Sequence, residues 1–63
     1  MSSTVHAELG AAADAIGRYR SRVSGLIESL GPNTEDLATA MSEAERALLS
    51  AERLLIRAEK LSR

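Results

Sequence analysis

The side chains best suited to chemistry in this sequence are the carboxylates of its second half: Glu43, Glu45, Glu52 and Glu59. A pair of carboxylates can cleave a glycosidic bond by general acid and base catalysis, but only inside a cleft. These glutamates alternate with basic residues, and Glu52 and Glu59 repeat at seven, as do Arg46 and Arg53. Charges at that spacing are typical of residues that flank a helix–helix contact. We therefore interpret them as pairing charges and do not expect an enzyme.

The sequence contains no other arrangement of residues that is typical of catalysis or metal binding. No serine has a histidine or lysine placed to activate it as a nucleophile. His6 is the one histidine, expected to be exposed in a first helical turn, and the chain has no cysteine. The sequence therefore predicts no metal and no cofactor. Tyr19, the single aromatic residue, is interpreted as a core residue.

A cluster of arginines raises nucleic-acid binding as an alternative. On a helix Arg18 and Arg22 share one outer face, whereas Arg20 points elsewhere. The formal net charge is −1, so no overall field attracts phosphates. No set of aromatic residues is available to stack on bases. We therefore do not expect a nucleic acid as the partner.

The elements that carry these residues are predicted to be two helices. Apolar residues in the first half alternate at spacings of four and three, the heptad pattern of a helix seam: Val5, Leu9, Ala12, Ile16, Tyr19, Val23, Leu26 and Leu30. This stripe predicts a helix over about 4–30. Gly31 is expected to adopt the left-handed conformation after its last turn, and Pro32 cannot continue it.

A second helix is predicted over about 34–62, after a turn at 31–33. Asn33 is its expected N-cap, and Glu35 and Asp36 place negative charge in its first turn. Small and apolar residues again form a heptad stripe: Leu37, Met41, Ala44, Leu48, Ala51, Leu55 and Ala58. So short a turn predicts an antiparallel hairpin of coiled-coil type, all-α and a single domain over 1–63, with the two stripes as the helix-pairing interface.

A second contact surface is predicted from residues outside these stripes. Leu49 and Ile56 fall nearly on the back of the second helix, one heptad apart. Gly10 and Gly17 lie on a small-residue flank of the first helix and would let another helix approach closely. We expect two hairpins to pair through these residues into a four-helix bundle.

Length favours such association, because a chain of 63 residues buries only about 60% of its unfolded surface. The sequence has neither a membrane-spanning run nor a signal peptide, so we expect a cytoplasmic protein. Its partner is expected to be a second copy of itself or a helical protein. The function predicted is a small interaction or assembly module that acts through helix packing.

Two family resemblances provide alternatives. The long Ala-rich helices and glycine turn resemble the small helical partners of type VII secretion, which implies a co-folding or chaperone role. Leu30, Gly31 and Pro32 stand where that family has its Trp-x-Gly turn. In length and architecture the chain is also similar to the plasmid-encoded Rop family of RNA-binding four-helix bundles, but it shares none of that family's residues.

Overall fold

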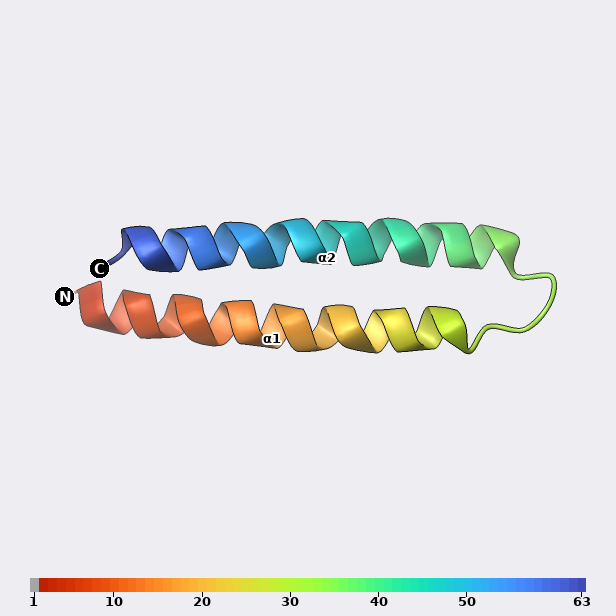
Figure 1. Ribbon diagram of the computed structural model, residues 1–63, viewed down its shortest axis with the longest axis horizontal. Helices are drawn as coiled ribbons and strands as arrows, with labels where there is room; N and C mark the ends of the chain where they lie inside the picture. Colours follow the sequence, from red (N-terminus) through yellow and green to blue (C-terminus); the bar gives the residue numbers. More distant parts are fainter. Residues whose placement is uncertain (1) are drawn as a thin grey trace.

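The chain folds as a helical hairpin in the computed structural model, which describes residues 2–63 and the side chains from residue 4 onward. Helix α1 spans Ser2–Glu28 and helix α2 spans Glu35–Leu61. The two run antiparallel and side by side (Figure 1) and pack against each other. The predicted all-helical hairpin is therefore confirmed. Its bounds differ by one or two residues from the expected 4–30 and 34–62.

The end of α1 is tightened by short-range hydrogen bonds. The backbone N–H groups of Ser29 and Leu30 donate to the carbonyl oxygens of Leu26 and Ile27 at 3.1 and 3.2 Å. The Ser29 hydroxyl also donates to Leu26 O at 2.7 Å. These bonds between residues three apart use carbonyls that a continuing α-helix would bond four residues on, and the helix stops at Glu28.

The turn uses a different residue from the one expected. Asn33 has a positive φ of 62°, and none of the described glycines has a positive φ. The expectation that Gly31 takes the left-handed conformation is therefore wrong, and so is the assignment of Asn33 as N-cap, a position held by Thr34. Asparagine is the non-glycine residue that best tolerates this conformation. The Thr34 hydroxyl donates to Gly31 O at 2.7 Å and braces the turn.

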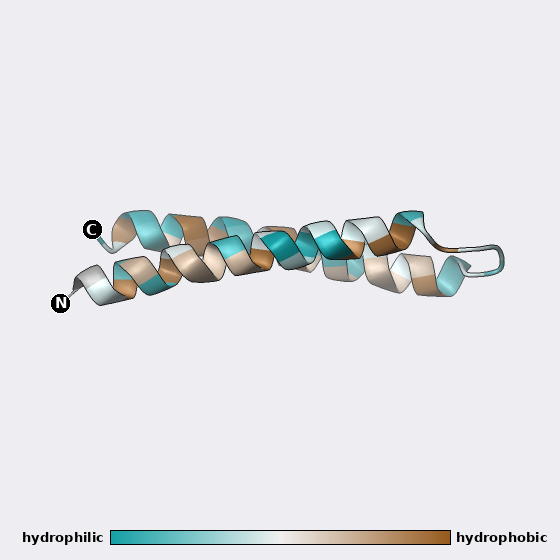
Figure 2. Cartoon of the chain, turned by 90° about the horizontal axis from the view of Figure 1, so that it is seen from below, coloured by the Kyte–Doolittle hydropathy of each residue, from teal (hydrophilic) through white to brown (hydrophobic). Residues whose placement is uncertain are grey.

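The contact between the helices runs along the whole rod, whose principal extents are 51, 14 and 10 Å. Seen from the side, α1 and α2 cross at a shallow angle (Figure 2), as expected of helices that share a heptad seam. Among the residues with a described side chain, Ala13 alone is buried, at 4% exposure. Neither helix is long and apolar enough to cross a membrane over the described residues.

Candidate interaction surface

The seam between the helices pairs small residues of α1 with glutamates of α2. A Cβ atom added at Gly10 would lie 2.9 Å from Glu59 Oε2, and one added at Gly17 would lie 2.6 Å from Glu52 Oε2. The next member of the series is Ser24, whose hydroxyl donates a hydrogen bond to Glu45 Oε2. The facing positions step by seven in opposite directions along the two helices. We call these six residues the polar seam.

Each glutamate of the polar seam has a polar partner on α1. Arg20 Nε donates to Glu52 Oε1 at 3.0 Å, and both side chains are half-buried. His6 Nε2 lies 3.9 Å from Glu59 Oε2. Glu45 accepts the bond from Ser24. Paired carboxylates therefore fix the register of the hairpin without a large apolar core between the helices.

His6 connects the beginning of α1 to the end of α2. Its Nδ1 lies 2.9 Å from Glu59 O and 2.9 Å from Ser62 Oγ. Because a carbonyl oxygen can only accept, Nδ1 carries the proton in the bond to Glu59 O. The expectation that His6 is simply exposed is therefore wrong, since its side chain is about two-thirds buried against the last turn of α2.

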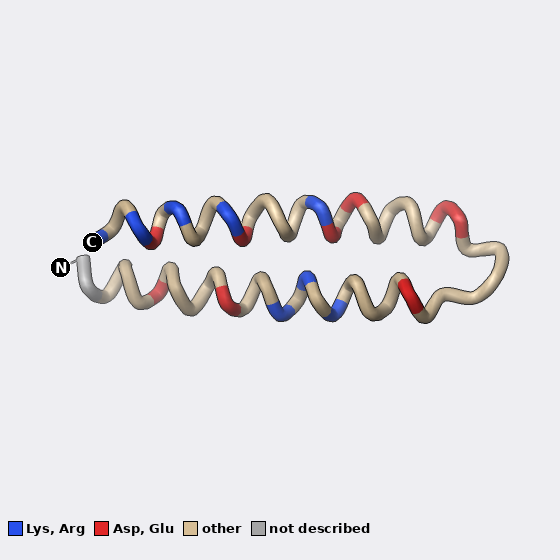
Figure 3. Tube along the Cα trace, viewed as in Figure 1, with Lys and Arg blue, Asp and Glu red and all other residues tan. Residues whose placement is uncertain are grey.

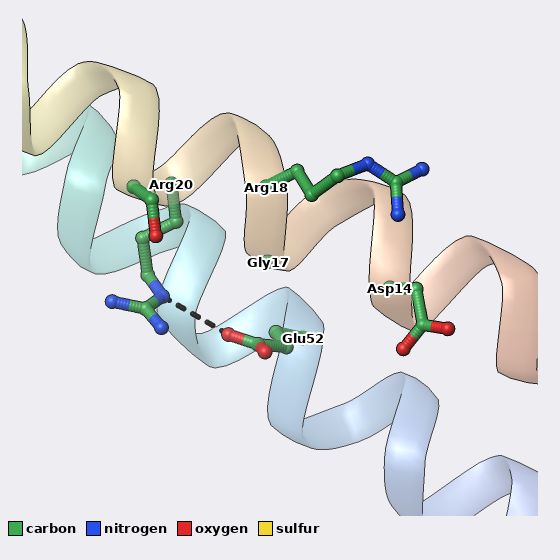
Figure 4. A pocket seen from close by; sticks show the side chains of 6 residues that line it. Asp14, Gly17, Arg18, Arg20 and Glu52 are labelled. Carbon is green, nitrogen blue, oxygen red and sulfur yellow. Dashed lines mark hydrogen bonds and ion pairs between the residues drawn. The ribbon is translucent and has the colours of Figure 1, made fainter.

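The surface next to Arg20 and Glu52 forms a shallow open hollow that also includes Asp14, Arg18 and Gly17. Figure 4 shows that Arg20 and Glu52 point toward each other, whereas the Arg18 guanidinium points away from both. No group of three potential metal ligands occurs in the described part of the chain. The hollow therefore combines one satisfied ion pair with two separate charges, and it does not assemble a catalytic constellation.

The side chains of the three clustered arginines lie in three different surroundings. Arg20 pairs with Glu52, the Arg22 guanidinium carbon lies 5.3 Å from the centroid of the Tyr19 ring, and Arg18 points outward (Figure 4). The first turns of α2 carry acidic residues alone, and basic residues alternate with acidic ones along the rest of that helix (Figure 3). Arg22 over the Tyr19 ring is a cation–π contact. The cluster thus does not form one continuous basic face.

The predicted pairing stripe of α1 is only partly covered by α2. Leu9, Ile16, Val23 and Leu30 are half-buried. The outer members are open: Val5 is 54%, Tyr19 55% and Leu26 51% exposed. The interpretation of Tyr19 as a core residue is therefore wrong, because α2 does not cover this part of the stripe.

The stripe of α2 is divided in the same way. Met41, Leu48 and Leu55 are half-buried, and so are Ala51 and Ala58. Leu37 and Ala44 are exposed, and Leu54 and Leu61 beside the stripe are exposed as well.

The two stripes lie on the same side of the hairpin. Ile16 precedes Gly17 on α1, and Ala51 precedes Glu52 on α2, each by one residue or about 100° of rotation. Antiparallel helices turn in opposite senses when viewed from one end, so this equal step leads to the same side on both. We call the surface made by the two stripes the open face. None of its residues is charged: Val5, Leu9, Ala12, Ile16, Tyr19, Val23, Leu26, Leu30, Leu37, Met41, Ala44, Leu48, Ala51, Leu55 and Ala58.

The residues predicted to make a second contact surface lie nearer the polar seam. Gly10 and Gly17 are covered by Glu59 and Glu52 of the same hairpin. Leu49 is half-buried, and Ile56 is 37% exposed at the edge away from the open face. In the sequence, the small-residue flank of α1 and the glutamate heptad of α2 are separate features. Their matching periods of seven residues are the signal that predicts their pairing.

No family model, curated protein or solved structure matches this chain. The resemblances to type VII secretion partners and to Rop therefore stay predictions, and the function is argued from the surface alone.

Proposed function

We propose that this protein is a non-enzymatic interaction module that binds another helical element through the open face. The observation that carries the proposal is an uncharged, half-exposed apolar surface along the entire rod of a hairpin whose described part buries one alanine. Contiguous apolar patches of this extent mark sites of association in proteins.

The size of the open face suits a stable protein–protein contact. A side 51 Å long and 14 Å wide has a projected area of about 700 Å², of the same order as the roughly 800 Å² of accessible surface that each partner contributes to a standard interface. Each Leu or Ile side chain that becomes fully buried contributes about 1.5–3 kcal/mol before ordering costs. Several half-buried aliphatic residues are available on each helix, so their completed burial can determine the affinity.

Folding itself provides a second argument. Fixing the backbone costs roughly 1–2 kcal/mol per residue, and apolar burial is the main favourable contribution that offsets it. The polar seam adds little, because partly exposed ion pairs contribute about 0.2–1 kcal/mol each. A hairpin that encloses so little apolar surface gains its stability by covering the open face with other helices.

The proposal can be tested by placing one negative charge either on the open face or on another side of α1. Ala12 belongs to the open face, and its neighbour Ala11 is exposed on another side of α1. We expect Ala12→Glu to weaken association at least tenfold, because the carboxylate would be buried without a partner. Ala11→Glu is the matched control and should associate like the parent chain.

The measurements are molar mass by light scattering and helix content by circular dichroism over a range of concentrations. A module of this kind shows helix content that rises with concentration or with an added helical partner. A fully helical, cooperatively melting single chain at all concentrations, with Ala12→Glu and Ala11→Glu indistinguishable, contradicts the proposal.

A further inference from the structure

The two halves of the open face differ in side-chain size. The outer row of α1 carries Tyr19 and Leu26, each more than half exposed. The corresponding outer row of α2 carries Ala44, Ala51 and Ala58. Over the middle of the rod α1 therefore presents large side chains and α2 small ones on the same side. Nearer the ends of the rod the two rows also contain Ala12 on α1 and Leu37 on α2.

The polar seam determines which large residue of α1 lies at the same height along the rod as which alanine of α2. Gly17 is level with Glu52, so two residues further along α1 Tyr19 is level with position 50, next to Ala51. Ser24 is level with Glu45, and by the same step Leu26 lies next to Ala44.

The same relationship places a large residue of α2 at the same height along the rod as a small one of α1. Two residues before Gly17, Ala15 is level with Leu54, which is 64% exposed at the border of the open face. Large and small residues thus alternate between the two helices at matched heights along the rod.

We propose that the occupant of the open face is a second copy of this chain, related by a two-fold axis parallel to the rod. This inference rests on the proposed function. That axis places α1 of each copy over α2 of the other without a shift along the rod. Tyr19 then packs on Ala51 of the second copy and Leu26 on Ala44, while Leu54 and Ala15 lie at the same height at the border of the interface. Each contact occurs twice, as a two-fold interface requires.

Size complementarity selects this arrangement over the other two-fold pairing. An axis across the rod would stack α2 on α2 and α1 on α1, so alanines would meet alanines and large residues would meet large ones. Axes of packed helices lie 8–10 Å apart depending on the side chains between them. The α2–α2 pair would then be closely spaced and the α1–α1 pair widely spaced, so the two hairpins would not lie parallel. When the large residues of α1 pack against the alanines of α2, both helix pairs have the same spacing.

The inner residues of the open face complete the resulting bundle. Ile16 and Val23 of α1, with Leu48 and Leu55 of α2, are half-buried at the groove between the helices. In the proposed pair they point to the central axis from all four helices and become a common core. The charged polar seam stays within each hairpin, and Arg22, whose guanidinium lies over the Tyr19 ring, stays with that side chain at the border of the interface.

The position of the turn tests the arrangement directly. With the axis along the rod both turns lie at one end, whereas an axis across the rod places them at opposite ends, about 51 Å apart. The chain has no cysteine, so Gly31→Cys, at an exposed position of the turn with open space around an added Cβ, provides a single attachment site for a spin label outside the open face. Pulsed electron paramagnetic resonance then measures the distance between the two labels.

We expect the purified variant to have twice the mass of one chain and a label distance below half the rod length. A dimer with labels separated by nearly the full rod overturns this arrangement and leaves the proposed function standing. A single chain that becomes helical only with another helical protein overturns the second copy as occupant. A stable helical monomer overturns both.

Covalent capture provides a second measurement. In the double variant Tyr19→Cys with Ala51→Cys, oxidation should yield chains linked by disulfides between copies. The control pairs Tyr19→Cys with Ser50→Cys, because Ser50 is exposed and points away from the open face. Equal yields of linked dimer from the two variants contradict the contact between Tyr19 and Ala51.

Discussion

Glu52 of α2 lies directly over Gly17 of α1, so near that a Cβ atom at Gly17 would come within 2.6 Å of Glu52 Oε2. The same glutamate accepts the hydrogen bond from Arg20 at 3.0 Å. The missing side chain of Gly17 thus creates the space in which the ion pair forms. This relationship allows the polar seam to be tested residue by residue.

Replacing Gly17 by alanine should stabilise the protein less than the same change elsewhere in α1. Glycine within a helix usually costs roughly 0.5–1 kcal/mol relative to alanine. At Gly17 that gain is offset because Glu52 must move and the bond to Arg20 is strained or lost. Gly25 is the matched control, since an added Cβ there meets nothing within 4 Å.

We therefore expect Gly25→Ala to raise the melting temperature by several degrees, since 1 kcal/mol corresponds to about 4–8 °C in a domain of this size. Gly17→Ala should leave it unchanged or lower it. Thermal melts followed by circular dichroism at equal protein concentration make the comparison. An equal gain for both variants would show that Glu52 does not depend on the glycine.

The ion pair in the polar seam should contribute a small, salt-sensitive stability. Glu52→Gln keeps the shape of the side chain but removes the charge that faces Arg20. We expect a loss of about 0.2–1 kcal/mol in the free energy of unfolding at low salt. Screening should reduce this difference as the ionic strength rises.

Glu43→Gln is the control for that substitution, because Glu43 is exposed on the same helix. Urea unfolding at low and high salt measures both variants. A penalty for Glu52→Gln that is no larger than the one for Glu43→Gln, or one that does not respond to salt, would count against the pair.

The turn should depend on Asn33 rather than on Gly31. Asn33 has a φ of 62°, a conformation that costs an ordinary L-residue roughly 1–2 kcal/mol. We expect Asn33→Ala to lower stability by about 1 kcal/mol and Asn33→Gly to be nearly neutral. Gly31→Ala should be tolerated, since no described glycine has a positive φ and Gly31 has open space around it. Equilibrium unfolding of the three variants decides the order.

The two helices and the short turn could be predicted from the sequence, because a sustained heptad pattern and the Gly31-Pro32 break are local signals. The residue that adopts the left-handed conformation could not be predicted from the sequence. Gly31 and Asn33 both tolerate it, and the choice depends on how the Thr34 hydroxyl and the last turn of α1 close the loop.

The location of the polar seam also could not be predicted from the sequence. Periodicity shows which residues share a face of a helix, but not what covers that face. The apolar stripes containing Leu26 and Ala44 were the natural choice for the contact within the hairpin. Gly17 and Glu52 suggest, one at a time, a weak helix position and a surface charge. Only together, at equal spacing on antiparallel helices, do they form a close contact.

The beginning of α1 and the end of α2 lie at the same tip of the rod (Figure 1). A fluorescent protein or an affinity tag fused at either terminus would be carried at that tip, with the bend 51 Å away and the flanks unobstructed. In this hairpin the choice between an N-terminal and a C-terminal fusion does not change where the cargo is held.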